Sequence, residues 1–479
     1  MNLLKRNIPL QILLFLILFF SACNNTENKT PKQKKIKVRD YSEIKKQKKL
    51  RVVTNLNSTD YFIYRGQPMG FQLELMQIFA KEINVDLEII AQNDLSRCFN
   101  MLETDSCDII AIGLTITKDR SEKVNFTVPY GFTNQVLVQR KPDNWPELSR
   151  KKIESHLLRN QLDLAKKNIY VQQNSAFVTR LRNLSQEIGD TIYIRQENIE
   201  TEELIRKVAI KKIDYTVCDE YVGLVNKTYY PQLDINTKIS FPQKLAWAVN
   251  KQSDTLLNIL NNWLTEFKTT RKFKNIYNKY FKNPKSASIF NSDYYLQETG
   301  QISPYDNYFK KYATELHWDW KLIASLAYQE SHFNNNARSW AGAFGVMQLM
   351  PITAERFNVD TNSSPAENIR AGIKYLKYLD KQLSTEITDT IERQKFIIAA
   401  YNSGLGHVLD ARRLAEKFDK NPNIWENNVD FYMAKKSTSK FYLDPVVKYG
   451  YCRGSETVNY VTEIFSRYEH YKNICANKK

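Results

Sequence analysis

The sequence contains few of the residues that interrupt a packed fold. Glycine and proline number only 14 each among 479 residues, which excludes a collagen-like or low-complexity chain. Apolar residues make up 42% and charged residues 25%, as in ordinary globular proteins. Because one hydrophobic core rarely serves a chain of this length, we expect two or three domains.

Long apolar runs are also missing, except near the N-terminus. Ile12 to Phe20 is an unbroken apolar run behind the basic residues Lys5 and Arg6. It is too short to span a bilayer, and no other stretch reaches the roughly 18 apolar residues that a membrane helix needs. Residues 1–22 are therefore predicted to be an export signal.

Phe20-Ser21-Ala22-Cys23 resembles the cleavage box of bacterial lipoproteins. The resemblance implies cleavage before Cys23 and acylation of that cysteine, and several acyl chains would anchor the protein stably. Asn24 follows where an aspartate would indicate inner-membrane retention. We therefore expect a cell-envelope protein, anchored in an outer membrane and facing the periplasm. The alternative is secretion with an incidental cysteine.

Cysteine is scarce, and its spacing predicts no metal site. The remaining cysteines fit no zinc pattern; they are Cys98, Cys107, Cys218, Cys452 and Cys475. In an exported protein Cys98 could pair with Cys107, or Cys452 with Cys475. An odd number leaves at least one thiol free.

The formal net charge is +17, and a basic surface favours polyanions such as anionic lipid or an acidic cell wall. Finger spacings, RNP-like aromatic motifs and basic zippers are absent from the sequence, so no nucleic-acid partner is predicted. Much of the charge falls in a lysine-rich stretch, and residues 23–48 are predicted to be a solvated linker behind the anchor.

Two regions with different secondary-structure patterns follow the linker. In residues 49–285 strands alternate with helices, which predicts a mostly parallel α/β domain. The expected strands are 50–54, 85–90, 107–112, 169–172, 191–194 and 215–218, with one more that starts at 245. After a predicted linker at 286–304, residues 305–479 show only helical periodicity, at 318–330, 366–383, 392–402 and 456–468. The fold class is therefore multidomain, an α/β domain followed by a mainly α domain.

One carboxylate in the helical region continues an apolar stripe. Trp318, Leu322, Leu326 and Glu330 recur every four residues, so they are predicted to share one helix face. A partly buried Glu330 would have a raised pKa, as a general acid working near neutral pH requires. The alternative is that the helix ends here and Glu330 points to solvent.

The surrounding motifs resemble the soluble-type lytic transglycosylase domain. They are Ala327–Phe333, Ala337–Ala354, Ala399–Gly406 and Gly450–Val461. The resemblance implies a lysozyme-like fold that cleaves peptidoglycan between N-acetylmuramic acid and N-acetylglucosamine, leaving 1,6-anhydromuramic ends. It also implies that Glu330 is the only catalytic acid/base, that Ser331 and Asn402 orient the substrate, and that no metal or organic cofactor takes part.

Other residues in these motifs suit a sugar substrate. Gln348 and Asn402 carry amides that match N-acetyl groups, and Tyr401 and Tyr460 offer aromatic surface or hydroxyls. Gly342 and Gly345 would let backbone approach a sugar closely. Ordinary packing or turn roles are the alternative for each of these side chains.

Residues 50–285 resemble the family-3 periplasmic solute-binding domain, which captures amino acids between two lobes. The matching segments are 70–75, 108–120, 124–130 and 212–219. The resemblance implies that Arg120 pairs with a ligand carboxylate, that Thr115 contacts it, and that Asp219 meets the ligand's ammonium. Tyr61 or Tyr64 is expected to cover the ligand. A retired domain that keeps only the scaffold is the alternative.

The order anchor, solute-binding domain, catalytic domain resembles membrane-bound lytic transglycosylases that carry both domains. We expect peptidoglycan as substrate and an amino acid or wall peptide as a regulatory ligand. A second hypothesis is a lipoprotein amino-acid receptor whose C-terminal domain only binds the cell wall. A third is a hydrolytic lysozyme that uses the same glutamate with a positioned water.

Overall fold

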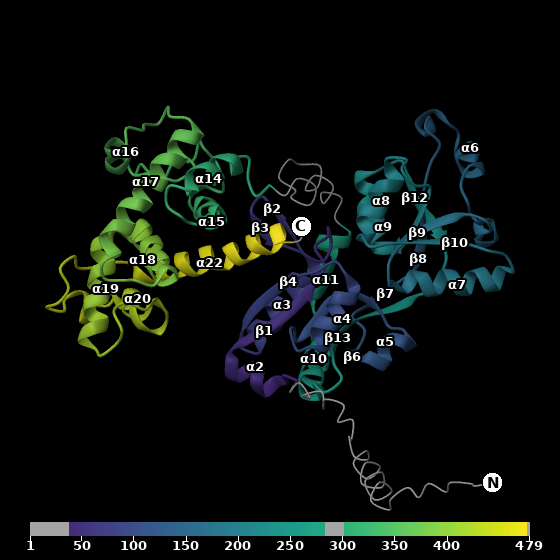
Figure 1. Cartoon of the computed structure of the whole chain (residues 1–479), viewed down its shortest axis with the longest axis horizontal. Coiled ribbons are helices and arrows are strands. Elements are labelled where there is room, and N and C mark those ends of the chain that lie inside the picture. The colour runs from purple at the N-terminus through teal and green to yellow at the C-terminus, as the bar shows by residue number, and fades with distance from the viewer. Residues whose placement is uncertain (1–37, 283–300, 477–479) are drawn as a thin grey trace, which may run out of the picture. The chain divides into compact units, whose positions relative to one another are not determined.

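The computed structural model describes residues 38–282 and 301–476 (Figure 1). The predicted export signal, Cys23 and the first part of the predicted lysine-rich linker lie outside the described residues. So does most of the predicted linker at 286–304, as does the side chain of Cys475. Within the described ranges no helix has both the length and the apolar character needed to cross a bilayer.

The first lobe of the α/β domain is built on a six-stranded sheet in the order β4-β1-β5-β13-β6, with β7 pairing β13. Its strands are β1 (Lys49–Thr54), β4 (Asp86–Ala91), β5 (Ile109–Thr115), β6 (Val124–Phe126), β7 (Gly131–Thr133) and β13 (Gln243–Asn250). Its helices are α2 (Tyr41–Gln47), α3 (Phe71–Glu82), α4 (Leu95–Glu103), α5 (Lys118–Lys123), α10 (Asp254–Phe267) and α11 (Arg271–Phe281). The β1 strand pairs in parallel with β4 and β5, as expected, whereas β13 is antiparallel to β5.

The second lobe has a five-stranded sheet in the order β10-β9-β11-β8-β12. Its strands are β8 (Gln135–Arg140), β9 (Asn168–Gln172), β10 (Tyr193–Glu197), β11 (Tyr215–Asp219) and β12 (Leu233–Lys238). Its helices are α6 (Arg150–Ser155), α7 (Ala176–Ile188), α8 (Thr201–Ala209) and α9 (Glu220–Tyr229), with 3-10 turns at Trp145–Glu147 and Gln161–Leu164. The chain passes from the first sheet into β8 and returns through β13, so the two lobes are joined by two crossings (Figure 1).

The end of the predicted lysine-rich linker is folded, and the prediction is wrong there. Asp40 caps α2 in a reciprocal capping box with Glu43, which satisfies free backbone amides. Ile44 is fully buried, and Arg39 donates to both carboxylate oxygens of Asp108 at 3.1 Å. Apolar burial and charge-assisted hydrogen bonds from one guanidinium nitrogen to both oxygens of Asp108 therefore hold this segment on the first lobe.

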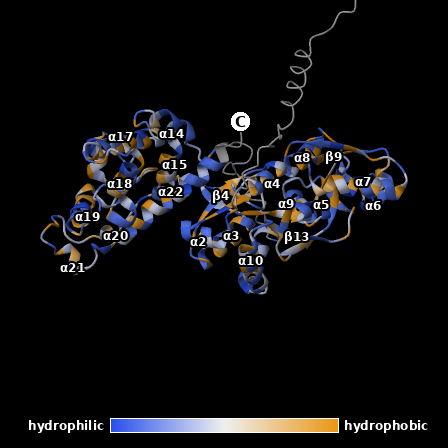
Figure 2. Ribbon diagram, turned by 60° about the horizontal axis from the view of Figure 1, so that its bottom comes forward, coloured by the Kyte–Doolittle hydropathy of each residue, from blue (hydrophilic) through white to orange (hydrophobic). Residues whose placement is uncertain are grey.

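The C-terminal domain is helical, and its described residues form isolated bridges but no strand. Its helices are α14 (Asp306–Ala313), α15 (Trp320–Ser331), α16 (Pro351–Arg356), α17 (Pro365–Leu383), α18 (Thr390–Ser403), α19 (Leu405–Lys417), α20 (Asp430–Lys435), α21 (Ser439–Tyr442) and α22 (Gly454–Ala476), with a π-type turn at Trp425–Val429. Trp318 precedes α15 because Asp319 caps it, so the predicted stripe on one helix face lacks its first member. Figure 2 shows apolar and polar residues interleaved along these helices, as expected when one face of each is buried.

Several side chains have roles that the sequence did not predict. Cys98 and Cys107 are buried free thiols, and Cys452 is also unpaired. Ile302, in the predicted interdomain linker, is buried in the C-terminal core. Tyr61 does not cover a ligand, because it is fully buried and its hydroxyl lies 3.0 Å from Nδ1 of His470 on α22.

The last turns of α22 contact the first lobe at further points. The hydroxyl of Tyr471 donates to the carbonyl of Gly66 at 2.9 Å, in the hairpin of β2 (Phe62–Tyr64) and β3 (Gln67–Met69). The amide of Asn473 donates to the carbonyl of Ile89 at 2.6 Å. One long helix therefore carries contacts with both the first lobe of the α/β domain and the interior of the C-terminal domain.

Candidate active site and ligand pocket

Glu330 lies at the C-terminal end of α15. The helix is anchored by its buried residues, which run from Leu322 to Tyr328, and it ends where His332 adopts a left-handed φ of 51°. The helix therefore ends beside Glu330, which is one part of the alternative in which Glu330 points to solvent. The carboxyl is nevertheless only partly exposed, and its Oε1 accepts a hydrogen bond from the hydroxyl of Tyr460 on α22.

Burial sets the acidity of this carboxyl. It raises the pKa of Glu330 to about 7, against the opposing effect of the Tyr460 hydrogen bond, which stabilises the ionised form. In the described part of the chain no second carboxylate contributes to this shift. A carboxylic acid that holds its proton near neutral pH can act as a general acid, so the predicted raised pKa is confirmed.

Ser331 and Gln348 are engaged with the loop that follows α15. The buried hydroxyl of Ser331 donates to the carbonyl of Val346 at 2.7 Å. The Gln348 amide nitrogen donates to the carbonyls of Ala337 (3.1 Å) and Gly345 (2.9 Å). Both side chains therefore hold the loop in place, which for Gln348 is the alternative role that the sequence left open.

Gly345 was expected to leave room for a sugar, but the space beside its Cα is filled by the side chain of Asn368. Its φ is 80°, and a Cβ at this position would lie 2.2 Å from Nδ2 of Asn368. Asn368 is almost fully buried on α17, accepts from the backbone amide of Met347 at 2.8 Å, and donates to the carbonyl of Phe344 at 3.3 Å. The glycine is therefore needed because Asn368 braces the loop.

Tyr401 and Asn402, next to each other on α18, complete the candidate site. The Tyr401 hydroxyl donates to the carbonyl of Met347 at 2.7 Å; burial and then the Glu330 charge raise its pKa. Asn402 accepts at Oδ1 from the hydroxyl of Thr457 on α22 at 2.8 Å, so its amide orientation is fixed. Four segments thus converge near Glu330: the ends of α15 and α18, the 344–348 loop and the start of α22.

Two residues of this region, Asn368 and Thr457, were not predicted from the sequence. Asn368 is a polar residue inside the buried stripe of α17, beside Ile369 and Gly372, and that mismatch was an available signal. Thr457 stands within a recognised motif, but no local pattern pairs it with Asn402. Only the approach of α22 to α18 reveals that contact.

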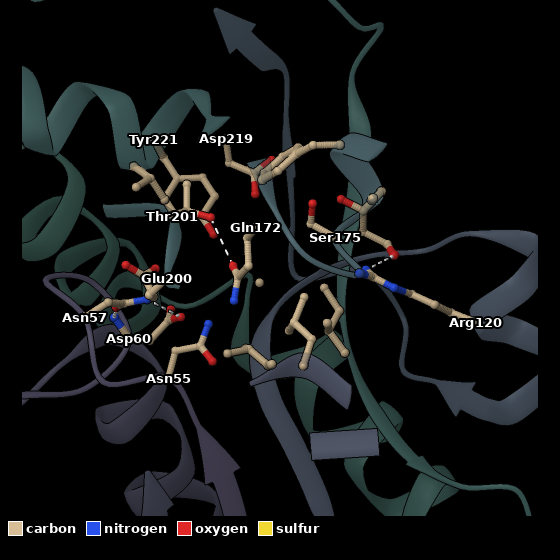
Figure 3. A pocket seen from close by; sticks show the side chains of 18 residues that line it. Asn55, Asn57, Asp60, Arg120, Gln172, Ser175, Glu200, Thr201, Asp219 and Tyr221 are labelled. Carbon is tan, nitrogen blue, oxygen red and sulfur yellow. Dashed lines mark hydrogen bonds between the residues drawn. The ribbon is translucent and has the colours of Figure 1, made fainter. Parts of the chain in front are cut away.

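In the α/β domain, the predicted ligand residues line one pocket (Figure 3). Thr115 ends β5 and Arg120 lies on α5, both in the first lobe, whereas Asp219 ends β11 in the second lobe. Arg120 donates to the carbonyl of Thr115 at 3.1 Å and to that of Asn174, across the lobes, at 3.4 Å. The structure therefore brings the three predicted residues together from both lobes.

The charges in this pocket are shielded from water. Burial lowers the pKa of Arg120 to about 10 against the attraction of Asp219. Burial also raises the pKa of Asp219 to about 7, although Arg120 opposes that shift. Sequence reasoning missed Asp60 and Glu200, which line the same pocket, because neither stands in a recognised motif.

Gln72, within the matching segment 70–75, has a structural role. It is almost fully buried, donates to the Tyr130 hydroxyl at 3.0 Å, and accepts from the indole nitrogen of Trp247 at 2.7 Å. It lies outside the pocket lining. Its amide supplies both a donor and an acceptor between two aromatic side chains, where a carboxylate could only accept.

Comparisons with known proteins match both regions. Residues 50–283 match the model of bacterial extracellular solute-binding proteins, family 3, and residues 307–424 match the transglycosylase SLT domain. An ancestral arginine-binding protein bound to arginine is 24% identical, with a TM-score of 0.41, over 49% of this chain and 98% of that chain.

Curated relatives match nearly the whole chain. The membrane-bound lytic murein transglycosylase F of Desulfosudis oleivorans is 32% identical over 428 residues, covering 89% of this chain and 90% of the relative. The protein of the same name from Photobacterium profundum is 32% identical over 90% of this chain and 81% of the relative. With both domain models matched in this order, the chain belongs to the membrane-bound lytic murein transglycosylase F family.

Proposed function

We propose that Glu330 is the single acid/base with which this chain, a peptidoglycan lytic transglycosylase, cleaves glycan strands. The bond cleaved joins N-acetylmuramic acid to N-acetylglucosamine, and the product carries a 1,6-anhydromuramic end. The observation that supports this role is the partly buried carboxyl of Glu330, whose pKa burial raises to about 7. Relatives named lytic murein transglycosylases, at 32% identity over nearly the whole chain, support the activity.

The reaction needs one proton donor that later becomes a base. Protonated Glu330 gives its proton to the glycosidic oxygen, the C1–O bond breaks, and the substrate's N-acetyl group stabilises the cationic C1. The ionised carboxylate then removes the proton from the muramic C6 hydroxyl, and that oxygen bonds to C1. Because the C6 hydroxyl replaces water, no second carboxylate is required, unlike in most glycosidases.

Tyr460 supports the stage of the reaction at which Glu330 is ionised. Its hydroxyl donates to Glu330 Oε1, and a hydrogen bond to a carboxylate stabilises the charged form. We propose that Tyr460 and Asn402 contact the substrate from α22 and α18. Ser331, Gln348 and Tyr401 instead shape the substrate site, since their polar groups bond to the backbone of the neighbouring loop.

The α/β domain is proposed to bind an amino acid or wall peptide and to regulate access to Glu330. Thr115, Arg120 and Asp219 would hold the ligand's carboxylate and ammonium, as pocket lining from both lobes supports. Regulation requires different affinities for two states of the chain. If calorimetry records binding while glycan turnover stays unchanged, the regulatory part of the proposal fails.

The names of the relatives say membrane-bound, which supports a cell-envelope location. We propose that acylated Cys23 is the anchor, in the outer membrane and facing the periplasm. The sequence of the cleavage box and Asn24 support this finer assignment. Metabolic labelling with a palmitate analogue should mark the full-length protein and leave a Cys23→Ala variant unlabelled.

The decisive experiment is mass spectrometry of purified peptidoglycan digested by residues 24–479, beside the Glu330→Gln variant. Anhydromuramic ends that vanish in the variant would support the proposal. Reducing ends would instead identify a hydrolase. The receptor hypothesis is not favoured by the relatives' names, and it would return only if neither protein released products.

A further inference from the structure

The pocket of the α/β domain has more negative than positive side chains. Among the residues that line it, three are carboxylates, Asp60, Glu200 and Asp219, and one is cationic, Arg120. Glu202 lies just behind them, buried, and accepts from the backbone amide of Ser58 at 2.9 Å. Carboxylates packed together away from water repel one another unless a proton or a cation neutralises them.

Two of these carboxylates have an oxygen with no hydrogen-bond partner. Oδ1 of Asp60 and Oδ1 of Asp219 are buried and unpartnered among the described residues, and the two residues are 3% and 8% exposed. The hydroxyl of Ser175, in the same lining, is also buried and unpartnered. A buried polar atom without a hydrogen-bond partner destabilises the fold, so these atoms mark positions where ligand donors belong.

The charges are separated within the pocket. Figure 3 shows Arg120 on one side, and Asp60, Asn57 and Glu200 gathered on the other. Asn57 donates to Oδ2 of Asp60 at 3.1 Å, which leaves Oδ1 available. Glu200 caps α8 with one carboxylate oxygen. The acidic group of Asp60 and Glu200 therefore lies apart from Arg120 (Figure 3).

The balance of charges in the pocket narrows the chemical class of the ligand. The main-chain part of any free amino acid brings one carboxylate, for Arg120, and one ammonium, for Asp219. That zwitterion brings no cation for Asp60 and Glu200, which are then neutralised only by protons. A neutral side chain would not relieve their repulsion, an acidic one would increase it, and a cationic one would form a charge-assisted hydrogen bond.

We infer that the pocket selects an amino acid with a cationic side chain, an ammonium or guanidinium, which binds between Asp60 and Glu200. The inference rests on the proposed function of the pocket and adds the chemical class of its ligand. Burial raises the pKa of Asp60 to about 7, and burial followed by the Glu202 charge raises the pKa of Glu200. Both directions fit carboxylates that lack a cation.

The test is isothermal titration calorimetry on residues 24–479 at pH 7.5. The ligands are L-lysine, L-ornithine and L-arginine, with L-leucine, L-glutamine and L-glutamate for comparison. We expect at least one cationic amino acid to bind ten times more tightly than any of the other three. Asp60→Asn should remove most of that preference while leaving leucine and glutamine binding within about twofold. Glu88→Gln, which neutralises an exposed carboxylate outside the pocket, should leave the preference intact.

Other outcomes would overturn the inference in distinguishable ways. Equal or tighter binding of leucine, glutamine or glutamate would overturn the selectivity for cationic side chains but would still support an amino-acid-binding pocket. An Asp60→Asn variant that weakens all ligands alike gives Asp60 a general structural role. If none of the six amino acids binds, the amino-acid function of the pocket fails as well.

Discussion

The hydroxyl of Tyr460 donates a hydrogen bond to Oε1 of Glu330. This contact joins the first turns of α22 to the end of α15, two helices that also pack through the bond from the Ser325 hydroxyl to the carbonyl of Ile464. The position of the candidate acid therefore depends on a helix more than a hundred residues further along the chain.

The first prediction concerns the alkaline side of the pH profile. Glu330 must be protonated to act as an acid, so kcat/KM should fall as pH rises above about 7. Tyr460→Phe removes a bond that favours the ionised carboxylate, which raises the pKa of Glu330 and moves this decline about one pH unit higher. Initial rates of glycan cleavage from pH 5 to 9 would measure it. Tyr401→Phe is the control, because that hydroxyl bonds to a carbonyl; an unmoved decline in Tyr460→Phe contradicts the prediction.

The second prediction concerns stability. The pKa of Glu330 rises from 4.5 to about 7 on folding, so in that window the native state keeps a proton that the unfolded chain has released. Stability therefore falls as pH rises from 4.5 to 7. Glu330→Gln removes this penalty, and above pH 7 its C-terminal domain should be more stable by about 2 kcal/mol, a discounted value for a partly exposed group. Scanning calorimetry should show a much larger gain at pH 8 than at pH 5; an equal gain at both would refute the electrostatic origin.

The third prediction compares two glycines of one loop. Both have positive φ, 86° at Gly342 and 80° at Gly345, so an alanine at either costs roughly 1–2 kcal/mol in backbone strain. Only Gly345→Ala also displaces Asn368 and its bonds to Met347 and Phe344, at about 1 kcal/mol each. The midpoint of thermal unfolding should therefore be well below that of Gly342→Ala in the Gly345→Ala variant. Similar losses of stability in the two variants would argue against the role of Asn368 in holding the loop.

The fourth prediction concerns a buried ion pair. Lys436 Nζ lies 2.6 Å from Asp410 Oδ2, and both side chains are fully buried. Burial alone would raise the pKa of Asp410, but bonds from Lys436 and the amides of Lys448 and Tyr449 hold it below its usual value. Lys436→Met removes one of the two cations that pair with Asp410, the other being Arg413, and should cost about 3 kcal/mol, the lower end for breaking a buried pair.

A double variant separates this pair from general packing. Lys436→Met combined with Asp410→Asn no longer buries a charge, so it should recover part of the stability lost in the single variant. A double variant as unstable as the sum of the two single variants would show that the pair is not coupled. Chemical denaturation monitored on the C-terminal domain provides the comparison.

The sequence by itself determined what depends on local periodicity and motif. The strands β1, β4, β5, β9, β10 and β11, the long helices α17, α18 and α22, and Glu330 as the candidate acid could be predicted from it, because side-chain period and short motifs are properties of neighbouring residues. The strands β8 and β12 were not predicted. Asp40 and Glu43 also held a helix signal that the lysine-rich composition obscured, and their capping box and the Arg39–Asp108 pair show why that segment folds.

Only the tertiary structure decided which side chains meet across long separations. It pairs Tyr460 with Glu330, places Asn368 against Gly345, and turns Tyr61 from an expected ligand cover into a partner of His470. It also gathers Asp60 and Glu200 beside Asp219, from segments with no common motif. The physical reason is that burial and electrostatic coupling depend on distance in space, and distance along the chain does not determine them.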